Sequence, residues 1–229
     1  MNAKILEIFP SIQGEGVYAG VKQVFVRFFE CHMHCVWCDT PDSIGDAKRE
    51  YKEYSQAELA KELRSLANGC HSASLTGGEP LLQVDFIKEF IPQIRQAGLK
   101  VYLETSGVLY RSLQKIITEV DIIAMDIKLP SSTQQRAFWK EHEEFLKTAV
   151  QKDVFIKAVI SSKTDLADIK KAADLISSIK KDVPVILQPN TYDLNNGAMQ
   201  KCARFYDYCL NYLSDVRIVP QIHKFLNIK

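Results

Sequence analysis

The sequence has no long hydrophobic run. Its uninterrupted apolar stretches, such as 24–26 and 122–125, are only a few residues long. A membrane-spanning helix needs about 20 consecutive apolar residues, so we predict none. The first seven residues also lack the apolar core and the small-residue cleavage site of a signal peptide. We therefore expect a cytoplasmic protein that does not bind membranes.

An excess of charge of one sign is also missing. The 29 Lys and Arg residues and the 28 Asp and Glu residues give a formal net charge of +1. Proteins that bind nucleic acids usually carry a basic excess or a basic stripe, so we expect no nucleic-acid partner. The 10 glycines and 8 prolines are too few for a low-complexity chain, and the hydrophobic fraction of 46% is that of a globular protein.

Cysteine is scarce but unevenly placed. Six cysteines in 229 residues are too few for a disulfide scaffold. Three of them, Cys31, Cys35 and Cys38, form the pattern C-x3-C-x2-C. Thiolates favour zinc or iron–sulfur clusters. A structural zinc ion would need a fourth ligand, for which His32 and His34 are candidates, whereas three cysteines on a four-iron cluster would leave one iron open to another molecule.

Beyond these cysteines, short β-rich runs alternate with segments of helical periodicity. We expect strands at residues 23–29, 72–76, 99–104, 121–126, 153–161, 183–188 and 215–219, and helices at about 55–67, 84–97, 166–180 and 199–213. The first helix begins with a capping box, in which Ser55 and Glu58 each bind the other's backbone amide. Such alternation predicts a parallel sheet covered by helices.

The number of strands limits the architecture. Seven expected strands in 229 residues are too few for a closed eight-stranded barrel of about 250 residues. We therefore expect an α/β fold, an incomplete (β/α) barrel of about six core parallel strands, in a single domain over residues 1–229. An open doubly wound sheet is the alternative. In both folds ligands gather at the carboxyl ends of the strands.

A second motif follows the strand expected at 72–76. Residues 76–80 read Thr-Gly-Gly-Glu-Pro, and glycines allow a ligand to approach the backbone closely. Together with the three cysteines and the aromatic Trp37 before the last of them, this motif resembles the radical S-adenosylmethionine (SAM) enzymes. The resemblance implies that Cys31, Cys35 and Cys38 bind a [4Fe-4S] cluster and that SAM binds the fourth iron. The reduced cluster would then cleave SAM to methionine and a 5′-deoxyadenosyl radical.

Segments outside this superfamily core narrow the resemblance. They are Ile12-Gln13-Gly14-Glu15-Gly16, Arg27, Asp39-Thr40 and the Pro-Gln-Ile-His-Lys segment at 220–224. From Ile12 to His223 the chain resembles 7-carboxy-7-deazaguanine synthases. These lyases convert 6-carboxy-5,6,7,8-tetrahydropterin to 7-carboxy-7-deazaguanine, with loss of ammonia, in queuosine and 7-deazapurine biosynthesis. The resemblance further implies Mg²⁺ as a cofactor, a homodimer, and a flavodoxin- or ferredoxin-like electron donor.

The resemblance also implies roles for individual residues. Thr40 would bind Mg²⁺ through its hydroxyl oxygen. The SAM-binding residues would be Trp37, Cys38, Asp39, Gly78, Asp126, Ile127, Lys128 and Gln188. The substrate-binding residues would be Ile12, Gln13, Gly14, Glu15, Arg27, Thr76, Glu104, His223 and Lys229. Among these, Glu104 and His223 are also candidates for acid–base catalysis. Other members have Ser-Pro-Lys where this chain has Asp126-Ile127-Lys128.

Some residues can be interpreted without the resemblance. Arg27 lies in a strand whose other residues are mostly apolar, and a buried guanidinium needs a partner. A substrate carboxylate would be a bidentate partner, and a structural ion pair with Glu30 or Glu15 is the alternative. His142 falls in the charged run 140–144, so we expect it to be exposed.

Two other functions remain open. A radical SAM activase, which abstracts hydrogen from a glycine of a partner protein, would share the three cysteines. It would not need Thr40, Arg27 or the segment 13–15. A non-enzymatic iron–sulfur or zinc module would leave both Thr40 and the segment 76–80 unexplained.

Overall fold

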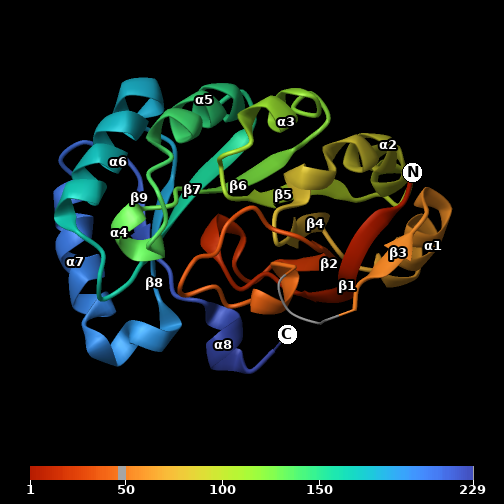
Figure 1. Ribbon diagram of the computed structural model, residues 1–229, viewed down its shortest axis with the longest axis horizontal. Coiled ribbons are helices and arrows are strands. Elements are labelled where there is room, and N and C mark those ends of the chain that lie inside the picture. Colours follow the sequence, from red (N-terminus) through yellow and green to blue (C-terminus); the bar gives the residue numbers. More distant parts are fainter. Residues whose placement is uncertain (46–49, 229) are drawn as a thin grey trace.

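The computed structural model describes residues 1–45 and 50–228, which are built around one nine-stranded sheet (Figure 1). The strands are β1 (Ala3–Ile12), β2 (Lys22–Phe28), β3 (Lys52–Tyr54), β4 (Ser72–Gly77), β5 (Lys100–Thr105), β6 (Ile122–Asp126), β7 (Asp153–Ile160), β8 (Val185–Pro189) and β9 (Val216–Ile218). Their order in the sheet is β3-β1-β2-β4-β5-β6-β7-β8-β9. From β2 to β9 all neighbours are parallel, whereas β1 is antiparallel to β2 and β3.

The helices lie mainly on the outer side of the curved sheet (Figure 1). They are α1 (Gln56–Leu66), α2 (Val84–Gln96), α3 (Tyr110–Gln114), α4 (Pro130–Thr133), α5 (Trp139–Ala149), α6 (Leu166–Lys180), α7 (Ala198–Cys209) and α8 (Ile222–Leu226). None of the helices in the described part of the chain is long and apolar enough to cross a membrane.

The predicted fold class is confirmed. The parallel strands β2 and β4 to β9 lie where the seven strands were predicted, and the sheet is a curved, open one with β3 and β9 at its edges. The capping box at Ser55 is present and begins α1 as predicted. The parallel part of the sheet has one strand more than the expected six.

Several elements were not predicted, and two of them, β1 and α5, change the interpretation of the sequence. Strand β1 contains Pro10, which usually argues against a strand; it is tolerated here outside the parallel part of the sheet. Helix α5 covers the charged run that was expected to expose His142, and that expectation is wrong. His142 is fully buried together with Phe145, Leu146 and Ala149. These residues recur at helical spacing, so the charged residues occupy only the opposite face of α5.

The inner face of the sheet changes character along each strand. Near the amino ends it carries the buried cluster of Tyr102, Ile122, Ala124, Phe155 and Ile186. Side chains two residues apart in a strand share a face. The next inner-facing positions, at the carboxyl ends, are therefore Glu104, Asp126, Lys157 and Gln188, and all four are polar. The inner side of the sheet is therefore filled by apolar side chains near the amino ends of the strands and has a polar surface at their carboxyl ends.

Candidate active site

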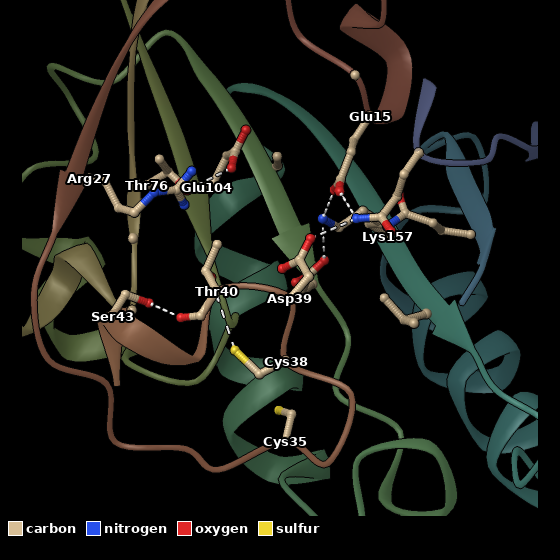
Figure 2. A pocket seen from close by; sticks show the side chains of 18 of the residues that line it. Glu15, Arg27, Cys35, Cys38, Asp39, Thr40, Ser43, Thr76, Glu104 and Lys157 are labelled. Carbon is tan, nitrogen blue, oxygen red and sulfur yellow. Dashed lines mark hydrogen bonds and ion pairs between the residues drawn. The ribbon is translucent and has the colours of Figure 1, made fainter. Parts of the chain in front are cut away.

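A cavity of about 390 Å³ lies at the carboxyl ends of the parallel strands. Consecutive strands of the sheet each contribute a polar residue to its wall: Arg27, Thr76, Glu104, Asp126, Lys157 and Gln188. Figure 2 shows side chains from this wall facing those of the loop that contains Cys35, Cys38 and Thr40. The volume lies within the range that binds small molecules and cofactors.

The cavity brings together nearly all residues that the sequence suggested for the site. The predicted residues that line it are Ile12, Gln13, Gly14, Glu15, Arg27, Cys31, Cys35, Trp37, Cys38, Asp39, Thr40, Thr76, Gly78, Glu104, Asp126, Lys128, Gln188 and His223. Ile127 is the exception, because its side chain is only 2% exposed and packs in the main core. Only its backbone remains for a contact with SAM. Lys229 lies outside the described residues.

The three cysteines lie on the loop that follows β2. Cys31 and Cys35 pack against a small apolar cluster formed by Met33, Val108 and Phe138. Burial raises the pKa of the Cys31 thiol to about 11 and also raises the pKa of Cys35. An iron–sulfur cluster would offset this cost, because the positive charge of a metal stabilises the thiolate form. Cys31 and Cys35 beside an apolar surface, with Cys38 on the same loop and at the same cavity, therefore fit such a cluster.

The glycines at 77 and 78 let two backbone segments touch. A Cβ atom on Gly78 would lie 2.2 Å from the carbonyl oxygen of Glu30, so a larger residue would push the segments apart. The amide of Gly78 donates to Phe28 O at 3.1 Å, and the amide of Glu79 donates to Glu30 O at 2.8 Å. The Gly-Gly segment is thus fixed to the start of the cysteine loop, and both glycines face the cavity.

Glu79 is not among the residues that line the cavity. It is fully buried and accepts hydrogen bonds from the Thr105 hydroxyl at 2.9 Å and from the Ser106 amide and hydroxyl at 2.8 and 2.6 Å. The amide of Leu81 also donates to it, at 3.1 Å. Glu79 therefore joins the loop after β4 to the loop after β5 and leaves only backbone groups of its own segment at the cavity.

Glu104 is the centre of a second group of polar side chains. Its carboxylate accepts from Gln13 Nε2 at 2.6 Å, from the Thr76 hydroxyl at 2.8 Å and from the Ser74 hydroxyl at 3.3 Å. These donors come from β4 and from the segment after β1. They hold the carboxylate in one orientation, with its charge at the cavity wall.

Arg27 does not pair with either of the residues that the sequence suggested as its structural partners. Its Nε donates to Glu7 Oε1 at 2.8 Å, because Glu7 lies directly opposite Arg27 in the β1–β2 pair. Glu30 pairs with Lys4 instead, and Glu15 pairs with Lys157. The expected alternative partners were wrong because β1 was not predicted.

A chain of alternating charges crosses the floor of the cavity. Lys157 forms ion pairs with Glu15 and with Asp126, whose other oxygen lies 2.6 Å from Lys128 Nζ. Burial alone would raise the pKa of Glu15, but the charge of Lys157 and hydrogen bonds from Lys157 and Gln221 lower it to about 2. Burial would lower the pKa of Lys157, yet Asp126 and Glu15 raise it well above its usual value. Glu15 and Lys157 therefore stay charged at neutral pH.

Comparison with known proteins identifies the family. The radical SAM superfamily model matches residues 26–176. A 7-carboxy-7-deazaguanine synthase from Geobacter sulfurreducens is 35% identical, over 98% of this chain and 97% of that protein. One from Archaeoglobus fulgidus is 31% identical over the full length of both. The chain belongs to the 7-carboxy-7-deazaguanine synthase family of the radical SAM superfamily.

A solved structure agrees with the fold of this family. The crystal structure of QueE from Escherichia coli superposes with a TM-score of 0.65, covering 97% of this chain and 95% of that one at 19% sequence identity. Radical SAM enzymes use a [4Fe-4S] cluster and SAM, and the three cysteines and the backbone of the Gly-Gly segment present the groups that these cofactors need. The predicted superfamily and family are confirmed.

Sequence reasoning missed several residues that line this cavity, among them Lys157 and Gln221. Lys157 had a usable signal, because it is a charged residue with apolar neighbours on both sides in β7, as Arg27 is in β2. Gln221 had none beyond its place in the Pro-Gln-Ile-His-Lys segment. Its Nε2 donates to Glu15 Oε1 at 2.7 Å and to Asp39 Oδ2 at 2.8 Å.

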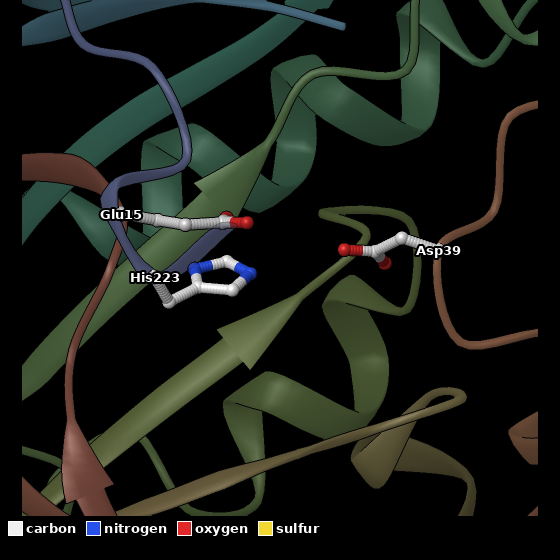
Figure 3. Close-up of side chains that lie close together, drawn as sticks. All are labelled: Glu15, Asp39 and His223. Atoms are coloured by element: carbon white, nitrogen blue, oxygen red, sulfur yellow. The ribbon is translucent and has the colours of Figure 1, made fainter. Parts of the chain in front are cut away.

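Gln221 lies beside a convergence of Glu15, Asp39 and His223, which come from three separate segments (Figure 3). One potential ligand atom from each of these three residues lies within 4.8 Å of the others. Oxygen and nitrogen donors in this arrangement are of the kind that bind divalent cations. Here Lys157 and Gln221 already provide partners for the carboxylates. We therefore assign no metal to this group.

Proposed function

We propose that this chain is a 7-carboxy-7-deazaguanine synthase. The reaction converts 6-carboxy-5,6,7,8-tetrahydropterin to 7-carboxy-7-deazaguanine and ammonia. The observation that carries this proposal is the arrangement of one cavity: the three cysteines line one wall, and Glu104 with its hydrogen-bond donors lines another. An enzyme that makes a radical from SAM and uses it on a pterin needs both sets of groups at one cavity.

The cysteine wall would hold the cofactors. Cys31, Cys35 and Cys38 would bind three irons of the cluster, which supplies the electron that cleaves SAM into methionine and a 5′-deoxyadenosyl radical. SAM would bind the backbone of Trp37, Cys38, Asp39, Gly78 and Ile127 and the side chains of Asp126, Lys128 and Gln188. Lys128 Nζ lies 5.2 Å from the centre of the Trp37 ring, so its charge is held at this wall.

The Glu104 wall would hold the pterin. A carboxylate fixed by three donors can still accept from the amino-pyrimidine N–H groups, because each oxygen has two lone pairs. Arg27, oriented by Glu7, is a bidentate donor suited to the substrate carboxylate. Thr76, His223 and residues 12–15 complete the substrate wall in this proposal, and Glu104 and His223 are its candidates for acid–base catalysis.

Thr40 would contribute a ligand to Mg²⁺. Its hydroxyl oxygen lies 4.0 Å from Cys38 Sγ and lines the same cavity, so Thr40 would hold the ion beside the cysteine wall. Mg²⁺ takes hard oxygen ligands and keeps several from water and substrate, so one threonine hydroxyl suffices from the protein. We further propose that the enzyme works as a homodimer in the cytoplasm and receives its electron from a flavodoxin- or ferredoxin-like protein.

The test is anaerobic turnover of the reconstituted protein with dithionite, SAM, Mg²⁺ and 6-carboxytetrahydropterin, followed by mass spectrometry. We expect 7-carboxy-7-deazaguanine to form without matching consumption of SAM. Cleavage of SAM to 5′-deoxyadenosine with an untouched pterin would contradict the substrate and would favour an activase of a partner protein. A reconstituted cluster that does not cleave SAM at all would contradict the enzymatic function.

A further inference from the structure

We propose that Gln221 is a positioning residue: it fastens the segment 219–228 over the cavity and fixes Asp39 between the cluster ligand Cys38 and Thr40. This inference deepens the proposed function and rests on it. Gln221 is 7% exposed and lines the cavity, but it is not expected to touch the reacting atoms. Its role would be to hold the segment 13–15 and the cysteine loop at fixed positions relative to each other.

The hydrogen bonds of Gln221 determine which way its amide faces. The Thr191 hydroxyl donates to Gln221 Oε1 at 2.7 Å, so the oxygen of the amide faces Thr191. The two N–H groups of Nε2 then point toward the carboxylates of Glu15 and Asp39, at 2.7 and 2.8 Å. An amide nitrogen has two hydrogens, one for each acceptor. Hydrogen bonds to charged acceptors are about twice as strong as neutral ones.

These bonds connect segments that are far apart in the sequence. Glu15 lies between β1 and β2, Asp39 lies on the cysteine loop, and Thr191 follows β8. At the next residue in the chain, the backbone N–H of Ile222 donates to Gly14 O at 2.8 Å. A Cβ atom at position 14 would lie only 2.1 Å from His223 Nδ1, so this contact requires glycine. The start of α8 therefore rests on the segment 13–15, and Gln221 extends the contact to the cysteine loop.

Charge explains why an amide occupies this place. Glu15 has the cation Lys157 as a partner, and Gln221 donates to the carboxylates of both Glu15 and Asp39. A glutamate at position 221 would have the same size but would put a third carboxylate against the first two. A methionine would keep the length of the side chain and remove the donors. We therefore expect the contact to be weakened most by Gln221→Glu, less by Gln221→Met and least by Thr191→Val. Thr191→Val removes only the bond that orients the amide of Gln221.

Loss of this contact should affect binding more than the chemical step. Asp39 is adjacent to Thr40, so its displacement should raise the Mg²⁺ concentration needed for half-activation. Movement of the segment 13–15 should raise KM for the pterin. We expect increases of about 10- to 100-fold for Gln221→Glu and about 10-fold for Gln221→Met. We expect kcat at saturation and the iron content to change much less.

The experiment combines these kinetics with hydrogen–deuterium exchange of the protein as purified, without substrate. Gln151→Met is the matched control, because Gln151 is exposed and bonds only locally, to Thr148 O. We expect faster exchange in peptides that cover 36–41 and 219–228 in both Gln221 variants and no change in the control. If Gln221→Glu does not fold, the same measurements on Gln221→Met and Thr191→Val test the proposal.

Each outcome is decisive. Faster exchange together with higher KM and higher Mg²⁺ requirement supports the positioning role. Faster exchange with unchanged kinetic constants would show that Gln221 makes only a structural contact. Unchanged exchange would show that Gln221 does not fasten the segment 219–228. Either result overturns the proposal. If the unmodified protein does not act on the pterin, the proposed function fails, whereas the exchange data still report on the contact itself.

Discussion

The cysteine wall and the Glu104 wall of the cavity are built in different ways. The cysteines lie on an irregular loop, whose backbone is fixed by bonds such as Cys31 N to Ile44 O at 3.0 Å. Their sulfur atoms make long contacts, as between Met33 N and Cys31 Sγ at 3.4 Å. Glu104 instead stands on a regular strand and accepts three side-chain hydrogen bonds. One wall is suited to ligation by a prosthetic group, and the other is a preformed acceptor for a substrate.

The largest effect is expected from a variant that removes a ligand from the cysteine wall alone. Cys35→Ala should abolish cluster binding and all SAM cleavage, because the remaining thiols cannot hold the cluster for catalysis. Iron content and visible absorption measure cluster binding, and 5′-deoxyadenosine formation measures SAM cleavage. The matched control is Cys209→Ala, which alters a cysteine buried on α7 outside the cavity. Retention of colour and full turnover in Cys35→Ala would refute the assigned ligand.

The complementary variant changes the Glu104 wall alone. Glu104→Gln keeps the size of the side chain but removes the charge that Gln13, Thr76 and Ser74 surround. We expect KM for the pterin to rise by about 10- to 100-fold, since a hydrogen bond to a charged group contributes about 1.5–3 kcal/mol. Cluster content and the affinity for SAM should stay as in the unmodified protein. A lower iron content in Glu104→Gln would show that the two walls are not separable.

Behind the cysteine wall, His142 should make stability depend on pH. Its Nδ1–H donates to Gly107 O at 2.9 Å and its Nε2 accepts from the Lys128 amide at 3.0 Å, so the neutral ring is required. Burial lowers its pKa to about 4. The unfolded chain, with a histidine pKa near 6.5, takes up the proton first as the pH falls. Stability should therefore fall between about pH 6.5 and pH 4, by about 2 kcal/mol from pH 7 to pH 5.

Urea denaturation of the protein at pH 7 and pH 5 measures this difference. His142→Gln can keep both hydrogen bonds with a side chain that does not titrate, so its stability should change less between the two pH values. An equal loss in both proteins would show that other groups cause the acid sensitivity.

The smallest effect is expected from a variant of Thr40, the candidate Mg²⁺ ligand. Thr40→Ala should raise the Mg²⁺ concentration for half-activation by roughly 10-fold, because the ion would keep its other oxygen ligands. Cluster content should not change, and Thr148→Ala, on the outer helix α5, is the control. A Mg²⁺ response identical to that of the unmodified protein would remove Thr40 from the metal site.

The two walls also differ in how far the sequence predicted them. The spacing of the cysteines and the Gly-Gly segment predicted residues that do line the cysteine wall. The three cysteines lie within eight residues of the chain, so their pattern is visible in the sequence. Glu104 and Thr76 were predictable as polar ends of predicted strands, and Arg27 as a charged residue within one. The partner of Arg27 was not, since Glu7 lies on a strand, β1, that contains a proline and pairs outside the parallel sheet.

Contacts of helix α5 and of the C-terminal segment with distant residues were not predicted. His142 carries no local signal of burial except that Phe145, Leu146 and Ala149 share its face, and neighbouring charges obscured this pattern. Gln221 contacts Glu15 and Asp39, which are 206 and 182 residues away in the sequence. No spacing rule joins such residues, because their contact depends on how the whole sheet curves.

The central claim is that the two walls act on one reaction across one cavity. The most direct measurement uses a pterin that carries deuterium on the carbon bearing the carboxylate, with mass spectrometry of the SAM recovered after turnover. A radical made at the cysteine wall should take deuterium from a pterin held at the Glu104 wall, so the recovered SAM should gain deuterium in its adenosyl group. Formation of the deazaguanine with unlabelled SAM would contradict this account.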